Sequence, residues 1–254
     1  MPLDVNDLVG FYSSPLGDVS RRLIGRVLRA RWDSCARLSM LALGFGCPYL
    51  DRFRDEAQRA LAFMPAEQGV VNWPSGGRSA AALVAPDMLP LPDASIDRAL
   101  VIHGLETAEH PGAVLEEVWR VLTPGGRLIV VAPSRRGVWA RADGTPFGQG
   151  QPYSKGQLRE LMRDALFSPI FWGEALYAPP FRRRFFIRSA PAIERLGAAI
   201  GLPFAGVLIV EATKQVYRPV GVRHAPEKAV EITSVHRCES SRKGPGGRNR
   251  CRRR

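Results

Sequence analysis

Two glycines separated by one residue follow an apolar run near residue 40. The run 41–43 leads directly into Gly44-Phe45-Gly46. A glycine turn between a buried strand and a helix lets the backbone approach a nucleotide-like ligand without interference from Cβ atoms. Such a turn is weak evidence by itself, because many α/β proteins place glycines there for packing. Gly44, Phe45 and Gly46 are therefore candidate ligand contacts whose role depends on the elements around them.

Polar side chains follow two later apolar runs. His103 comes directly after the run Arg98–Ile102, and Asp87 and Met88 follow Ala81–Val84. A neutral imidazole at a strand end can accept a proton from a substrate, so His103 is the candidate catalytic residue. The alternatives are that His103 only caps its strand and that Asp87 belongs to an ordinary turn. Both alternatives stay open from the sequence.

Strands and helices alternate along the chain at a spacing typical of βαβ units. Apolar runs predict buried strands, Pro111 opens a helix, and Thr123 to Gly126 ends it just before the next run. Ser154 and Gln157 have the spacing of a capping box, which predicts a helix from Lys155 to Leu166. This alternation favours an α/β fold with a parallel sheet. The elements expected are helices at 18–30, 49–58, 111–122, 155–166 and 192–200, and strands at 37–43, 60–64, 81–84, 98–102, 128–132, 170–177 and 206–213.

The order of these motifs carries a family resemblance. After the glycine turn come Leu-Pro-Leu-Pro-Asp-Ala-Ser-Ile-Asp at 89–97, then His103, then Arg-Val-Leu-Thr-Pro-Gly-Gly-Arg at 120–127. This succession resembles the class I S-adenosylmethionine-dependent methyltransferases, particularly the type 11 group. The resemblance covers roughly residues 38–133.

The resemblance implies both a fold and a site. The fold would be a Rossmann-like, seven-stranded, mostly parallel sheet with helices on both faces, and the cofactor would lie across the ends of its first strands. The activity implied is methyl transfer from S-adenosylmethionine to an unidentified, small-molecule acceptor. The residues implied in cofactor binding are Gly44, Phe45, Gly46, Asp87, Met88 and His103.

The chain departs from the family pattern at its acidic positions. Ala42 stands two residues before the first glycine, Met64 at the end of the second strand, and Ala85 after the third; the family usually has an acid at each. Glu67 and Asp87 are nearby substitutes. Each missing charge-assisted hydrogen bond could cost ~1.5–3 kcal/mol of binding. The alternative function is therefore a catalytically inactive binding protein with the same fold.

Composition and charge limit the remaining classes. Of the net charge of +12, residues 218–254 carry eleven Lys/Arg against three Glu, a net +8. We expect an N-terminal helical lid at 1–34, the methyltransferase-like domain at 35–217 and a disordered basic tail at 218–254. That tail motivates a further alternative, nucleic-acid binding. The N-terminus lacks a secretory pattern, which predicts a cytoplasmic protein, and we expect neither a membrane span nor a metal site.

Overall fold

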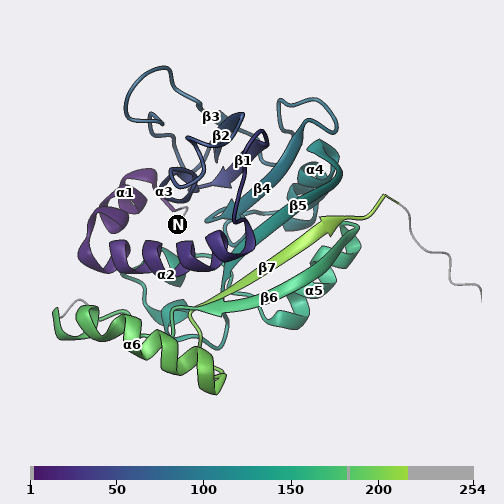
Figure 1. Ribbon diagram of the computed structural model, residues 1–254. Coiled ribbons are helices and arrows are strands. Elements are labelled where there is room, and N and C mark those ends of the chain that lie inside the picture. The colour runs from purple at the N-terminus through teal and green to yellow at the C-terminus, as the bar shows by residue number, and fades with distance from the viewer. Residues whose placement is uncertain (1–2, 182–183, 217–254) are drawn as a thin grey trace, which may run out of the picture. The chain divides into compact units, whose positions relative to one another are not determined.

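Seven strands form one sheet in the order β3-β2-β1-β4-β5-β7-β6 (Figure 1). The computed structural model describes residues 3–181 and 184–216. The strands from β1 to β5 pair in parallel, whereas β7 runs antiparallel to both β5 and β6. The predicted seven-stranded, mostly parallel Rossmann-like sheet is thus confirmed. The strands are β1 (Ser39–Gly44), β2 (Arg59–Pro65), β3 (Ala81–Val84), β4 (Ile96–Ile102), β5 (Leu122–Pro133), β6 (Phe167–Ala175) and β7 (Val207–Lys214).

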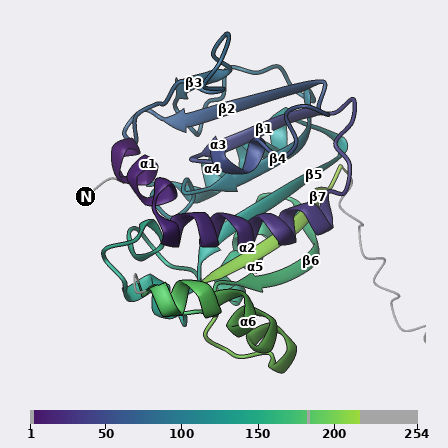
Figure 2. The ribbon, with the colours of Figure 1, turned by 60° about the vertical axis from the view of Figure 1, so that its left-hand side comes forward.

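Helices cover both faces of the sheet, and each face buries its own apolar core. Alternate side chains of a strand point to opposite faces. Met40 and Ala42 of β1 therefore pack with α1 and α2, while Leu41 and Leu43 pack with α4 and α5. Figures 1 and 2 show α2 crossing one face and α4 and α5 on the other. The helices are α1 (Val5–Ser13), α2 (Pro15–Arg31), α3 (Cys47–Leu50), α4 (Pro111–Val121), α5 (Lys155–Asp164) and α6 (Arg184–Ile200), with 3-10 turns at Val138–Arg141 and Pro146–Gly148.

Local sequence signals explain several helix ends. Ser154 and Gln157 form the predicted capping box at the start of α5. Ser14 caps α2 and accepts a hydrogen bond from Gly17 N, so the expectation of a start at Asp18 is wrong. Asp18 instead lies in the first turn of α2, where its carboxylate pairs with two arginines of the same helix.

The structure corrects three further expectations. The helix expected at 49–58 is a single turn, α3, followed by turns as far as residue 57. The helix expected at 192–200 is the second half of the longer α6. The sequence reasoning missed α1, whose N-cap Asp4 accepts a hydrogen bond from Asn6 N. Its apolar residues Val5, Leu8, Val9 and Tyr12 have helical spacing, a signal that the sequence reasoning overlooked.

The helices of the predicted lid segment belong to the same compact unit as the sheet, Met1–Arg218. Glu211 of β7 is fully buried and binds α2 through Arg31 Nε at 2.7 Å and Trp32 Nε1 at 3.2 Å. A buried carboxylate needs such partners, so this contact fixes the end of α2 against the sheet. The predicted tail, residues 218–254, lies outside the described residues.

Candidate active site

The glycine turn lies where β1 and β4 end side by side. Gly44 has φ +87°, and a Cβ there would approach Ile102 O to 2.2 Å. A Cβ on Gly46 would approach the Cβ of Ala42 to 2.4 Å. Each glycine therefore has a packing reason to be glycine. Their presence is explained whether or not a ligand binds.

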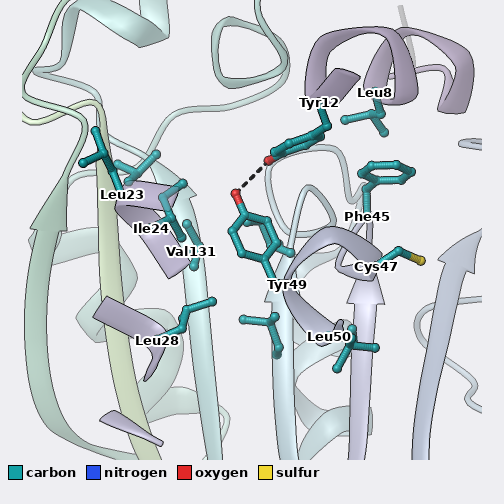
Figure 3. Packing of buried hydrophobic residues seen from close by; sticks show 14 of the residues in the cluster. Leu8, Tyr12, Leu23, Ile24, Leu28, Phe45, Cys47, Tyr49, Leu50 and Val131 are labelled. Atoms are coloured by element: carbon teal, nitrogen blue, oxygen red, sulfur yellow. Dashed lines mark hydrogen bonds between the residues drawn. The ribbon is translucent and has the colours of Figure 1, made fainter. Parts of the chain in front are cut away.

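Aromatic side chains from α1 and α3 cover this turn. The Tyr12 ring stacks on Phe45 with centroids 5.7 Å apart and an interplanar angle of 24°. Its hydroxyl lies 3.0 Å from the Tyr49 hydroxyl, as Figure 3 shows. Phe45 is only 3% exposed, and Gly44 and Gly46 are buried. In this arrangement α1 closes the space over the glycine turn.

A chain of hydrogen bonds runs from this aromatic cluster to a carboxylate. Tyr12 Oη lies 2.7 Å from His103 Nε2, and His103 Nδ1 lies 3.1 Å from Glu106 Oε1. All bonds are satisfied if Nδ1–H donates to Glu106, Nε2 accepts from Tyr12, and Tyr12 accepts from Tyr49. Burial raises the pKa of Tyr12 well above its usual value, with Tyr49 and Glu106 adding to the effect. Both phenols therefore remain protonated donors at neutral pH.

His103 holds an uncommon backbone conformation at the end of β4. Its φ is +53°, in the left-handed region that few residues other than glycine adopt, although histidine is among the more tolerant. The ring packs against Phe147 with centroids 4.8 Å apart and is fully buried. The imidazole is thus held in place from both sides, by Tyr12 and by Phe147.

Two buried acceptor atoms next to His103 lack hydrogen-bond partners among the described residues. They are Gln68 Oε1 and Glu106 Oε2. Gln68 donates through Nε2 to His103 O at 2.9 Å, and its own backbone carbonyl accepts from Val5 N of α1. An unpaired buried acceptor costs free energy, and such atoms mark places where a ligand donor or water belongs.

A cavity of about 270 Å³ lies at the carboxyl ends of β2, β3 and β4. Leu3, Val84 and Val114 give it apolar walls, while Glu67 and Asp87 stand in its lining as exposed carboxylates. Ligands of open α/β sheets bind at this edge. The cavity therefore has the position and the mixed chemistry of a nucleoside site.

A second, larger cavity of about 630 Å³ lies between α1 and the segment after β5. Phe11 and Pro146 belong to its walls, and Asp7 and Asp143 contribute carboxylates. Phe11 also packs edge-on against Phe147, at 6.1 Å between centroids, so the wall of this cavity backs onto the His103 cluster. It offers room for a small molecule on the far side of that cluster.

The structure brings together some of the predicted site residues and separates others. Gly44, Phe45, Gly46 and His103 form one buried cluster under α1. Asp87 lines the 270 Å³ cavity, as does Ala85, where the family usually has an acid. Met88 is 74% exposed and Met64 is fully buried within β2.

Sequence reasoning missed Tyr12, Gln68 and Glu106. Tyr12 reaches the site from α1, a helix that the sequence reasoning did not identify although its apolar residues have helical spacing. Glu106 is three residues past His103 in the sequence, a spacing that hinted at a His–carboxylate pair. Nothing in the sequence singled out Gln68. The reasoning considered its charged neighbour Glu67 instead.

Comparisons with known proteins agree with this geometry. Residues 72–130 match the family described as "Methyltransferase domain". Demethylmenaquinone methyltransferase of Chlamydia trachomatis is 31% identical over 113 residues, covering 38% of this chain and 48% of the relative. These matches support a class I S-adenosylmethionine-dependent methyltransferase family for this chain. It spans about half the length of the curated relatives that it matches.

Several solved structures share the fold of this chain at low sequence identity. A SAM-dependent methyltransferase of Thermotoga maritima, titled a possible histamine N-methyltransferase, is 17% identical with a TM-score of 0.57, covering 83% of this chain and 96% of its own. The [4+2]-cyclase SpnF is 22% identical with a TM-score of 0.55, covering 78% of this chain and 81% of its own. Both likenesses concern the fold.

S-adenosylmethionine is the cofactor of this family, and the residues present fit its two halves differently. The 270 Å³ cavity, with apolar walls and carboxylates in its lining, suits the nucleoside half. The methionine half would face Gly44 and Gly46, where Tyr12 and Phe45 fill the space in this arrangement. The full cofactor therefore fits only if α1 moves away from the glycine turn.

Among the described residues no helix is long and apolar enough to cross a membrane. The same residues hold no group of three or more His, Cys, Asp and Glu that could bind a metal ion. Cys35 and Cys47 are free and buried, and burial raises the pKa of the Cys47 thiol to about 12. Neither thiol is poised as a nucleophile.

Proposed function

We propose that this chain is an S-adenosylmethionine-dependent methyltransferase that acts on a small-molecule acceptor. The observation that carries the proposal is the cavity at the carboxyl ends of β2, β3 and β4, directly beside the glycine turn. The family match and the sheet order support it.

The chain's own residues suit each part of this task. Asp87 and Glu67 at the cavity offer acceptors to a nucleoside, and the apolar walls exclude water from its base. The cofactor, when bound, supplies an electrophilic methyl group on a sulfonium. His103, with Nδ1–H donated to Glu106, presents Nε2 as a base once Tyr12 withdraws. Glu106 then stabilises the imidazolium that forms.

Opening of α1 is the step that this mechanism requires. The helix is attached through Val5 N to Gln68 O at 2.8 Å and through Tyr12 to His103 and Tyr49. Releasing Tyr12 would clear the glycine turn and free His103 Nε2 in one movement. The closed arrangement would keep the imidazole protected from solvent until ligands arrive.

Titration calorimetry with S-adenosylmethionine and S-adenosylhomocysteine tests the proposal. We expect saturable binding of both, with Asp87→Ala weakening both. Glu116→Gln, an exposed change on the outer surface of α4, is the matched control and should bind as the native chain does. If no heat of binding is detected at millimolar cofactor, the proposal that the chain is a methyltransferase is refuted.

A second candidate is a non-catalytic member of the family. The buried glycine turn and the absent acids at Ala42, Met64 and Ala85 favour it. The fold also supports other reactions, since SpnF is a cyclase. Absence of cofactor binding in the calorimetry would favour this second candidate. Nucleic-acid binding stays a prediction, because it depends on residues 218–254, outside the described part of the chain.

A further inference from the structure

Only one of the two oxygens of the buried Glu106 carboxylate has a hydrogen-bond partner among the described residues. Its residue is 3% exposed; Oε1 contacts His103 Nδ1, while Oε2 has no hydrogen-bond partner among the described residues. We propose that Glu106 Oε2 binds the ammonium group of the cofactor's methionine half. This inference depends on the proposed function.

Glu106 lies close to the turn that the methionine half would face. Gly104 packs against Gly44, and a Cβ on Gly104 would lie 3.4 Å from Gly44 Cα. Gly104 and Thr107, on either side of Glu106, both line the 270 Å³ cavity. A ligand that extends from this cavity toward Gly44 would therefore pass Gly104, two residues before Glu106.

The charge around Glu106 is unbalanced. The protein has 36 Lys and Arg, yet within residues 3–181 and 184–216 none pairs with this carboxylate. Its negative charge contributes to the raised pKa of Tyr12 and of Tyr153, after burial of each ring. A buried carboxylate without a cation is costly, and the ligand that satisfies it should carry a positive charge and N–H donors.

Gln68 Oε1 is a second unpartnered buried acceptor, on a side chain that donates through Nε2 to His103 O. An ammonium group has three donors, so it can serve more than one acceptor. A neutral nucleoside hydroxyl would satisfy one acceptor and leave the charge of Glu106 unbalanced. The ammonium group therefore suits the unpaired oxygen of Glu106 better than a nucleoside hydroxyl does.

The test uses Glu106→Gln in the full chain, with two ligands that differ in the amino-acid part. S-adenosylhomocysteine carries the ammonium, whereas 5′-methylthioadenosine lacks the whole amino-acid group. Losing a charge-assisted hydrogen bond should weaken S-adenosylhomocysteine binding by about tenfold to a hundredfold. Binding of 5′-methylthioadenosine should stay within about twofold. Glu109 is an exposed acid that lines the same cavity, so Glu109→Gln is the control. It should change the affinity for either ligand less than Glu106→Gln changes the affinity for S-adenosylhomocysteine.

Thermal unfolding of the free protein supplies an independent readout. Glutamine retains an oxygen for His103 Nδ1–H and removes an unbalanced buried charge, so the melting temperature of the Glu106→Gln protein should not fall. A lower melting temperature with unchanged ligand affinity would show a structural role and overturn the inference. Equal weakening of both ligands would overturn it as well. Failure of the native chain to bind either ligand would instead refute the proposed function, and the inference with it.

Discussion

Tyr12 provides the sharpest test of how the site opens. Tyr12→Phe removes the hydroxyl that contacts His103 Nε2 at 2.7 Å and Tyr49 Oη at 3.0 Å, but keeps the ring that stacks on Phe45. Each buried hydrogen bond contributes about 1 kcal/mol net, so the closed arrangement should lose about 2 kcal/mol. The free energy of unfolding, measured in urea, should fall by that amount.

The same loss should strengthen cofactor binding. If closure of α1 competes with the cofactor, weakening the closed state by about 2 kcal/mol raises the apparent affinity for S-adenosylhomocysteine by up to about thirtyfold. Calorimetry measures this gain. The opposite signs of the two effects, less stability and tighter binding, identify Tyr12 as a gate.

Tyr153→Phe is the matched control for this prediction. Its buried hydroxyl donates to Leu105 O at 3.0 Å but does not cover the glycine turn. Its loss should lower stability by about 1 kcal/mol and leave the affinity unchanged. If Tyr12→Phe destabilises the protein and binds the cofactor no more tightly than the native chain, closure by α1 does not compete with the ligand and the reasoning is refuted.

Three further predictions concern the turn, the cavity and a buried thiol. Gly44→Ala places a Cβ 2.2 Å from Ile102 O at φ +87°, so urea unfolding should show a loss of more than about 2 kcal/mol. Asp87→Ala should weaken S-adenosylhomocysteine about tenfold in calorimetry with urea stability unchanged, since Asp87 is exposed in the cavity lining. The Cys47 pKa of about 12 lies above its unfolded value near 9, so the folded chain retains a proton that the unfolded chain loses in this range. The free energy of unfolding should therefore decline above pH 9, and less steeply in Cys47→Ala; equal slopes would contradict this.

Local sequence patterns were sufficient for the fold. The alternation of apolar runs with helix signals predicted the strands that became β1, β4 and β5, and the Ser154–Gln157 spacing predicted the start of α5. These signals act over a few residues, through side-chain periodicity and backbone capping, so they can be read without knowing distant contacts. At α1 the capping and periodic signals were present but overlooked, whereas after α3 the expected helix is replaced by turns.

The sequence by itself determined the family, the sheet and the positions of Gly44, His103 and Asp87 at strand ends. It also showed that acids are absent at Ala42, Met64 and Ala85. Only the tertiary structure decided that Tyr12, 91 residues before His103, closes the turn, and that Glu106 keeps a buried oxygen without a partner. Hydrogen bonds and burial depend on distances between elements that meet only when the sheet forms. For that reason the sequence could only nominate site residues, and the fold decided that the glycine turn is closed.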